Sequence, residues 1–353
     1  MAVTQNDVAR EAGVSQSLVA HVLNGRPGPW ASAEVRERIF ATAARLQYKP
    51  NAAARALRSG KTNTVALLYA RESSGAVSVG YSEVAEALSD HLAPLGYGLL
   101  IHSLPDSSRM MERIQNLRAT GACDFFVLLG DEIEIEPHAS LLAERGHRFA
   151  LKGHFESTHP DWPQVDFDHR GMMRGAVAFL VGCGHRRIAY LGHENMRVYA
   201  RELRAGFREA MAELAPAADL DRFHIPIRVR GEDAETVEEH MAAWDALPQG
   251  ERPTAAVVGA RDEAWLGLEL ALHRRGGRIG EGPGEFTVAG LSTRHHRPLF
   301  GRGYIFPRVE LYDLGKAMAE QIVGPLLQGH EIEQPIVRVL PRLQLGPLPL
   351  LAN

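Results

Sequence analysis

The chain has 353 residues, of which 45% are hydrophobic and 23% are charged, and its formal net charge is −4. This length exceeds one small module and suits a small domain followed by one or two α/β lobes. No stretch approaches the roughly 18 apolar residues of a membrane span, and the first residues lack the pattern of an export signal. These features exclude an integral membrane protein, and we expect a cytoplasmic chain with no membrane partner.

The charge is distributed unevenly along the chain. Residues 1 to 64 carry nine basic and four acidic side chains, a net charge of +5, which leaves −9 for the remaining residues. Lysine and arginine neutralise phosphates when a protein binds nucleic acid. The basic N-terminal segment is therefore the part of the chain that favours a nucleic-acid partner.

The first residues predict a helix-turn-helix. Thr4 can cap a first helix, Gly13 permits a tight turn, and Ser15 can cap a second helix. The expected buried side chains of the two helices are Val8, Ala9, Ala12, Leu18, Val19 and Val22. Gln16, Ser17 and His21 then face outward, where the second helix of such a motif contacts base edges. The alternative is a small helical bundle that does not bind DNA.

A third helix and a second basic segment follow. Ser32 can cap a helix from Ala33 to Leu46, and its apolar stripe completes a compact bundle. That stripe consists of Val35, Ile39, Ala43 and Leu46. Asn51 can cap a short alanine-rich helix from Ala52 to about Arg58, which at two turns is marginal in isolation. We expect this segment to fold only when it is paired on DNA.

Five short segments of this region match one family in order and spacing. They are Asp7-Val8-Ala9, Ala12-Gly13-Val14-Ser15, Val22-Leu23-Asn24-Gly25, Tyr48-x-Pro50-Asn51-Ala52-Ala53-Ala54 and Arg55-x-Leu57. On these motifs, the first sixty residues resemble the DNA-binding headpiece and hinge of the LacI/GalR family of bacterial transcription regulators. The resemblance implies a homodimer that places two such helices on double-stranded DNA, a near-palindromic operator.

The resemblance also implies roles for hinge residues. Leu57 matches a leucine that wedges into the central base step from the minor groove, while Arg55 and Arg58 are available to phosphates. A core leucine of a linker helix is the alternative for Leu57. The predicted DNA-binding residues are Thr4, Ser15, Gln16, Ser17, His21, Asn24, Asn51, Arg55, Leu57 and Arg58. The pattern Thr-Val-Ser-Arg that is common in the family after the turn is replaced here by Leu18-Val19-Ala20-His21. His21 is therefore the predicted base-contacting residue in place of an arginine.

Strand-like and helix-like segments alternate from Val65 onward. The expected strands are 65–69, 98–102, 125–129, 149–151, 188–191, 255–258 and 286–291, and the expected helices are 81–95, 170–181, 198–214 and 264–275. This alternation predicts parallel sheets covered on both faces. Gly184-His185-Arg186-Arg187-Ile188-Ala189 and Arg204-x-Gly206-Phe207 extend the family resemblance, which implies a core similar to periplasmic sugar-binding proteins.

The predicted fold is an all-α helix-turn-helix headpiece followed by an α/β core of two doubly wound parallel-sheet lobes. We expect the headpiece at 1–48, the hinge helix and linker at 49–64, and the two-lobed effector-binding and dimerisation domain at 65–353. The expected lobe crossings lie near residues 164, 292 and 330. Such cores bind a small ligand between the lobes, beyond the carboxyl ends of the strands.

The expected effector site departs from the sugar-binding pattern of the family. Where relatives carry acidic and amide groups, this chain carries basic ones, and acidic groups are lost. The predicted effector-binding residues are Lys152, His154, Arg201, Arg204, Arg261, Asp262 and Ser292. Basic groups favour an anionic effector, such as a sugar acid or a sugar phosphate, through charge-assisted hydrogen bonds. The alternative is that these side chains point to solvent.

Signals for other functions are weak. Gly290-Leu-Ser292 lacks the second glycine of a nucleophile elbow, and the sixteen histidines show no metal-binding spacing, so we expect no enzyme, no metal and no cofactor. Cys123 and Cys183 lie in apolar patterns, which suits buried thiols. We therefore expect a DNA-binding repressor that is controlled by a small molecule. A periplasmic-type solute-binding protein and a co-repressor-dependent regulator are the alternatives.

Overall fold

The structure is a computed structural model, and it describes most of the chain. The described residues are 3–23, 30–48, 60–70, 79–130, 132–155, 158–194, 198–216, 222–227, 233–259, 262–280, 285–290, 292–293, 304–309, 311–340 and 342–344. The chain forms two compact units, Met1–Asn63 and Thr64–Asn353.

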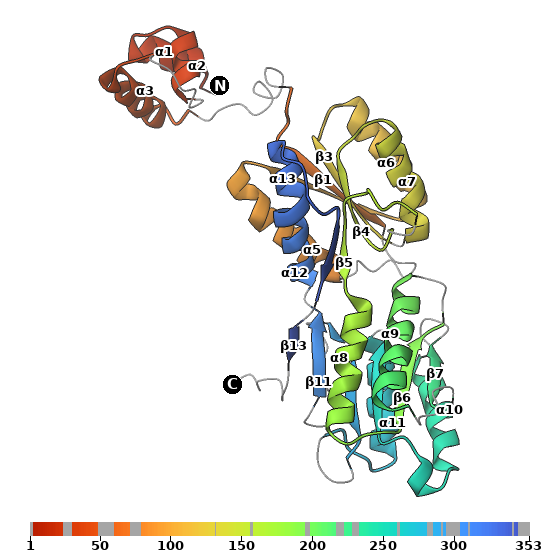
Figure 1. The fold of residues 1–353 in the computed structure, drawn as a ribbon. Helices are drawn as coiled ribbons and strands as arrows, with labels where there is room; N and C mark the ends of the chain where they lie inside the picture. The colour runs from red at the N-terminus through yellow and green to blue at the C-terminus, as the bar shows by residue number, and fades with distance from the viewer. Residues whose placement is uncertain are drawn as a thin grey trace. The chain divides into compact units, whose positions relative to one another are not determined.

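The N-terminal unit is a bundle of three helices, shown in red in Figure 1. They are α1 (Gln5–Ala12), α2 (Gln16–Leu23) and α3 (Ala33–Arg45). Val8, Val19 and Ile39, one from each helix, are completely buried against one another. Gly13 adopts a left-handed conformation with φ of 67° at the end of α1, which turns the chain directly into α2. The predicted helix-turn-helix is confirmed.

The core unit begins with a six-stranded parallel sheet of order β12-β5-β4-β3-β1-β2. Its strands are β1 (Thr64–Ala70), β2 (Gly98–Leu104), β3 (Phe125–Leu129), β4 (Phe149–Lys152), β5 (Gln164–Phe167) and β12 (Ile336–Val339). Successive residues of β1 point to opposite faces, so Val65 and Leu67 belong to one apolar cluster and Ala66 and Leu68 to another. The first lobe is thus buried on both faces.

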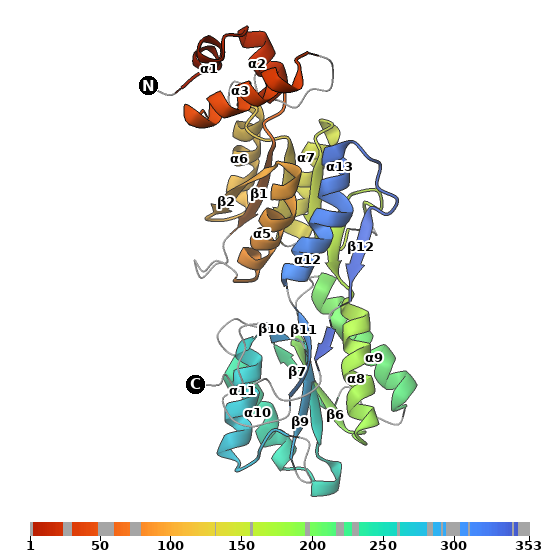
Figure 2. The same cartoon turned by 90° about the vertical axis from the view of Figure 1, so that its left-hand side faces the viewer.

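Helices cover each face of this sheet. The face of Val65 packs against α5 (Val79–Leu92), α12 (Leu311–Met318), the π-helical turn Ala319–Val323 and α13 (Gly324–Gln328). The face of Ala66 packs against α6 (Ser108–Ala119) and α7 (Glu132–Glu144). Figure 2 shows α5 and α12 side by side on the first of these faces.

The second sheet follows the order β10-β11-β9-β8-β6-β7 and is parallel along that path. Its strands are β6 (Ile188–His193), β7 (His224–Ile227), β8 (Ala255–Gly259), β9 (Thr287–Gly290), β10 (Ser292–Thr293) and β11 (Tyr304–Val309). One face packs on α8 (His169–Gly182) and α9 (Val198–Leu214), the other on α10 (Asp233–Asp245) and α11 (Asp262–Arg274). The prediction of two doubly wound parallel-sheet lobes is confirmed.

Several strands were not expected from the sequence. β5, β7, β11 and β12 are four to six residues long, and their apolar pattern is interrupted by Asp166, Pro226, Pro307 and Arg338. A further strand, β13 (Arg342–Gln344), pairs antiparallel with β11. Because β11 belongs to the second sheet and β12 to the first, the second and third lobe crossings lie beyond residues 309 and 339. The crossings expected near 292 and 330 are placed too early.

The two cysteines differ in their surroundings. Cys123 is partly buried, and desolvation raises the pKa of its thiol to about 12. Cys183 is exposed, because it caps the C-terminal end of α8 and does not lie within that helix. The expectation of a buried thiol is wrong for Cys183. Among the described residues, no helix is both long and apolar enough to cross a membrane.

Candidate functional site

The outer surface of α2 carries the predicted base readers. Gln16 and Ser17 are exposed and His21 is half-buried, whereas Val19 and Val22 on the opposite side are buried. Gln16 donates a hydrogen bond from Nε2 to Oε1 of Gln5, at 2.9 Å, which ties the start of α2 to α1. The exposed surface of α2 is therefore polar, and the hydrogen bond to α1 holds the start of α2 in place.

His21 is fixed by two neighbours. Its Nδ1 lies 2.7 Å from the carbonyl oxygen of Ser17, an oxygen to which an Nδ1–H group donates. Its ring stacks on Trp30, with 4.7 Å between centroids and 26° between planes, and Trp30 is itself 53% exposed. Nε2 is then the ring nitrogen left for a base edge. The sequence analysis did not single out Trp30. A tryptophan shortly before the predicted third helix was the available signal, because tryptophan is enriched where proteins contact partners.

The capping residues of the headpiece use their hydroxyl groups within the protein. Thr4 Oγ1 donates to Oδ2 of Asp7 at 2.7 Å, and Ser15 Oγ accepts from the amide of Leu18 at 3.3 Å. A phosphate contact by Thr4 or Ser15 would share these groups with the caps, so both remain predictions. Other predicted DNA-binding residues lie outside the described residues: Asn24, Asn51, Arg55, Leu57 and Arg58.

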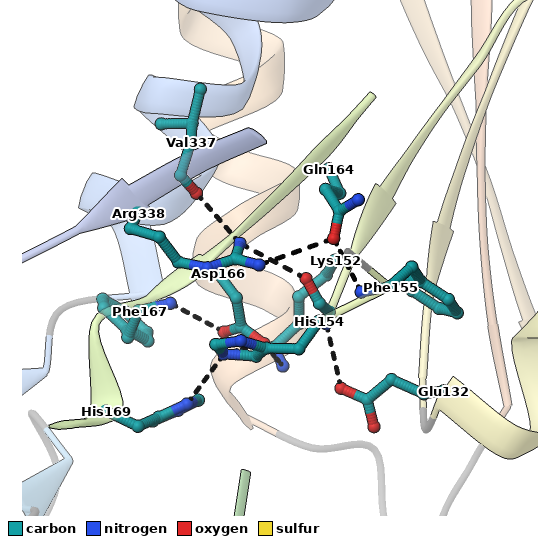
Figure 3. A network of polar contacts seen from close by, with 11 residues as sticks. Glu132, Lys152, His154, Phe155, Gln164, Asp166, Phe167, His169, Val337 and Arg338 are labelled. Atoms are coloured by element: carbon teal, nitrogen blue, oxygen red, sulfur yellow. Dashed lines mark hydrogen bonds and ion pairs between the residues drawn. The ribbon is translucent and has the colours of Figure 1, made fainter. Parts of the chain in front are cut away.

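A second polar cluster lies inside the core unit, where β4, β5 and the first turn of α8 meet (Figure 3). His154 follows β4, Asp166 belongs to β5, and His169 begins α8. All three side chains are buried, and no part of Asp166 is exposed. His154 Nε2 lies 2.9 Å from His169 Nδ1 and 3.7 Å from Asp166 Oδ2. Three polar side chains from three different elements of the fold are thus brought together in the interior.

Asp166 also forms an ion pair with Lys152. The Nζ of Lys152 lies 3.3 Å from Asp166 Oδ2, and the amide of Phe167 donates to Oδ1 at 2.8 Å. Burial opposes both charges, yet Lys152 and the two histidines lower the pKa of Asp166 below its ordinary value. Burial likewise opposes the charge of Lys152, but Asp166 raises its pKa overall. The charged forms of both partners are therefore stabilised by each other.

The histidine at the start of α8 is held neutral. Burial is the largest cause, and with the nearby charges of His154, Lys152 and Arg338 it outweighs Asp166 and lowers the pKa of His169 to about 4. A neutral imidazole keeps one lone pair, which accepts a hydrogen bond or binds a metal ion.

The loop after β4 is held by the groups around it. Gly153 has φ of 147°, and a Cβ atom there would lie 2.7 Å from the ring of Phe155, so this position requires glycine. Glu132 Oε1 accepts from the amide of His154 at 3.2 Å, and burial raises the pKa of Glu132. Gln164, completely buried, accepts from the amide of Phe155 at 2.6 Å. These contacts fix the backbone that carries the His154 side chain.

The structure brings only part of the predicted effector set together. Lys152 and His154 share the cluster, whereas Arg201 is exposed on α9 and Arg204 is close enough to Tyr190 to counter the effect of burial on its pKa. Arg261 and the side chains of Asp262 and Ser292 lie outside the described residues.

The acidic neighbours of Lys152 were missed. Asp166 and Glu132 lie beside it, and the predicted effector set named neither of them. The reason is that spacing along the chain cannot show that the start of α7 lies beside β4 and β5. Asp166, two residues before the Asp168 that caps α8, was the available signal.

Comparison with known proteins agrees with both units. The family model for bacterial regulatory proteins of the lacI family matches residues 4–51. A second model, for a periplasmic binding protein-like domain, matches residues 177–299. The two matches cover the helix-turn-helix and most of the second lobe.

Curated relatives match along the whole chain. Catabolite control protein A of Priestia megaterium is 26% identical, with 98% of each chain covered. The transcriptional regulator AglR of Rhizobium meliloti (strain 1021) is 24% identical, covering 99% of this chain and 96% of its own. The transcriptional repressor PurR of Salmonella newport (strain SL254) is 26% identical, covering 96% and 95%. Two of these relatives are named as transcriptional regulators.

Solved structures share the fold. A lac repressor dimer bound to operator and the anti-inducer ONPF superposes with a TM-score of 0.72 at 21% identity, covering 98% of this chain and 99% of that one. The complex of the regulator CelR with cellobiose gives 0.63 at 20% identity, with the same coverage. The headpiece motif, the two-lobed core and the full-length relatives all agree: residues 4–51 form a DNA-binding domain that matches the lacI family of bacterial regulatory proteins, and the chain as a whole is similar to transcriptional regulators.

Proposed function

We propose that this regulator is a repressor that binds a near-palindromic operator as a homodimer and is controlled by a small-molecule effector held between its lobes. The observation that carries the DNA part is the outer surface of α2, where Gln16, Ser17 and His21 are presented over a buried apolar face. One headpiece of three short helices contacts few base pairs. Two copies are needed for a specific site of useful affinity.

The edge of the first sheet supports the dimer. β2 is the outermost strand on its side and pairs only with β1 along the described sheet. Ile101 on this strand is 48% exposed, and beside it runs a groove lined by Tyr69, Ser82, Ala85, Glu86, Ser89, Leu99 and Ile101. An apolar, unprotected strand edge is a surface that proteins usually cover. We propose that a second copy of the chain covers it.

Effector control would act through the segment where the chain leaves the first lobe. β5 ends at Phe167, one residue after Asp166, and His169 begins α8, which packs on the second sheet. A ligand that contacts this segment and either lobe would favour one arrangement of the lobes over another. Release of DNA on ligand binding is the proposed outcome, and tighter DNA binding would identify a co-repressor instead.

We propose further that the effector is acidic, although the structure brings fewer of the predicted basic residues together than the sequence suggested. Lys152 is engaged by Asp166, so an acid would have to displace that carboxylate or bind through Arg201 and Arg204 on α9. Displacement would exchange one carboxylate for another at Lys152, which keeps the buried ammonium paired. The acid preference therefore depends on arginine groups in addition to Lys152.

Two experiments test these proposals in order. A mobility-shift assay with DNA from upstream of the gene, run with and without competitor DNA, tests operator binding; failure to bind any such fragment specifically contradicts the first proposal. Calorimetric titration with a hexose, its uronate and its phosphate tests the acidic effector. Binding of the neutral hexose alone, or acid binding that is unchanged both in R201A/R204A and in K152A, contradicts the second.

A further inference from the structure

We propose that His154, Asp166 and His169 form a binding site for one divalent transition-metal ion, with Zn²⁺ as the representative. Each side chain offers one ligand atom, and the three atoms lie within 4.8 Å of one another. Two imidazoles and one carboxylate are a ligand set that such ions bind. The inference concerns an ion and does not depend on the acidic effector proposed above.

The geometry is close to that of a metal site. Two nitrogen ligands at about 2.1 Å from an ion and at right angles to each other lie about 3.0 Å apart, and the observed separation of His154 Nε2 and His169 Nδ1 is 2.9 Å. Asp166 Oδ2, 3.7 Å from His154 Nε2, lies slightly beyond a tetrahedral spacing of about 3.4 Å. All three ligand atoms lie within 4.8 Å of one another, so modest side-chain adjustments would bring them to one ion.

Burial separates this cluster from the ordinary histidines of the surface. All three residues are buried, and Figure 3 shows the two imidazoles directed toward each other beside the Asp166 carboxylate. Both rings bind an ion in their neutral form, so the ion replaces the contact between the rings once one of them moves its proton to its other nitrogen.

Lys152 competes with the ion for the same oxygen. Its ammonium lies 3.3 Å from Asp166 Oδ2, and an ion bound to that oxygen would repel it. About 20% of the Lys152 side chain is exposed, which gives the ammonium a route toward water when the ion takes its place. The site would thus hold either Lys152 or the metal at Asp166. Removing Lys152 should therefore strengthen metal binding.

The position of the site means that a bound ion would connect the two lobes. His154 follows β4, Asp166 lies in β5, and His169 is in the first turn of α8, so one ion would join the first sheet to the helix that covers the second sheet. Fixing this connection would restrict how the segment between the lobes bends. The ion would act as a regulator of the chain, and the chemistry of recognition is nitrogen and oxygen ligation of a borderline divalent cation.

The test uses the full chain, freed of metal by a chelator, with Zn²⁺ or Co²⁺ alone as the probe. Calorimetry should give one site per chain, and Co²⁺ should show the visible absorption of a low-symmetry site with nitrogen ligands. H154Q and H169Q should each weaken binding by about tenfold or more, K152Q should strengthen it, and H138Q should leave it unchanged. His138 is a matched control, because it is a buried histidine bonded to the Ser107 carbonyl in the same lobe.

Two results would overturn the proposal. One is the same affinity for Zn²⁺ in the wild type and in the H154Q/H169Q double variant. The other is X-ray absorption of the Co²⁺-loaded wild type that shows fewer than two imidazole ligands, a measurement that needs no variant to fold. Neither result bears on binding of DNA or of a sugar acid.

Discussion

Gly206 is the position where a single added carbon should damage the second lobe. It lies in α9, directly against the start of α8, and a Cβ atom at this position would lie 2.7 Å from Cα and 2.8 Å from the carbonyl oxygen of Arg170. Carbon atoms of a well-packed interior approach one another to about 3.5–4.0 Å. Gly206→Ala would therefore force the two helices apart.

Two opposing effects determine how much Gly206→Ala changes the free energy of unfolding. Alanine within a helix is more favourable than glycine by about 1 kcal/mol, whereas overpacking costs about 1–3 kcal/mol. The contact is with main-chain atoms, and Arg170 is anchored to α9 by ion pairs with Glu202 and Glu209, so α8 cannot move away without disturbing them. We therefore expect overpacking to cost about 3 kcal/mol, the upper end of its range. After the gain of about 1 kcal/mol from alanine, the free energy of unfolding should fall by about 2 kcal/mol.

The assay is chemical denaturation followed by the fluorescence of Trp244 and Trp265, which are buried in the second lobe. Gly182→Ala is the matched control. That glycine ends α8, and a Cβ there would meet nothing within 4 Å. The free energy of unfolding of Gly182→Ala should therefore be unchanged or slightly higher than that of the wild type. Equal stability of Gly206→Ala and the wild type would refute the packing argument.

Three further predictions concern the headpiece, the hinge and the second lobe. His21→Ala should cost about 1–3 kcal/mol at one operator position and relax its base preference, as measured by competition with single-base operator variants; uniform weakening would show that His21 does not contact a base. Leu57→Ala should weaken operator binding at fixed salt without changing the unfolding of the core, and unchanged affinity would contradict a wedge role. His185 lies 2.9 Å and 3.0 Å from two threonine hydroxyls, and burial lowers its pKa, so stability is present above about pH 6.5 and is lost as pH falls; His185→Gln should flatten that dependence in acid denaturation, and an identical slope would count against it.

The headpiece was predictable in detail because its signals are local. Caps at Thr4, Ser15 and Ser32 and the glycine turn at Gly13 each involve residues within four positions of one another. Strands with an uninterrupted apolar run, such as β3 and β8, were equally clear. Local pattern sufficed wherever the structure is determined locally.

The polar cluster of the core could not be foreseen, because it depends on topology. Asp166 is completely buried in a strand of four residues, and such a charge is tolerated only beside Lys152 and the two histidines. Those partners become neighbours because β4 and β5 lie side by side in the sheet and α8 begins where β5 ends. Without the strand order, Lys152 looked like an unmatched basic residue.

Selection of bound sequences from randomised double-stranded DNA, using the full chain at one salt concentration, tests the central claim most directly. The account predicts enrichment of a near-palindrome with two half-sites, and loss of that enrichment in a Gln16→Ala/Ser17→Ala variant whose headpiece remains folded. Recovery of unrelated sequences by the wild type, or the same palindrome recovered by the variant, would contradict a role for the outer surface of α2 in reading DNA.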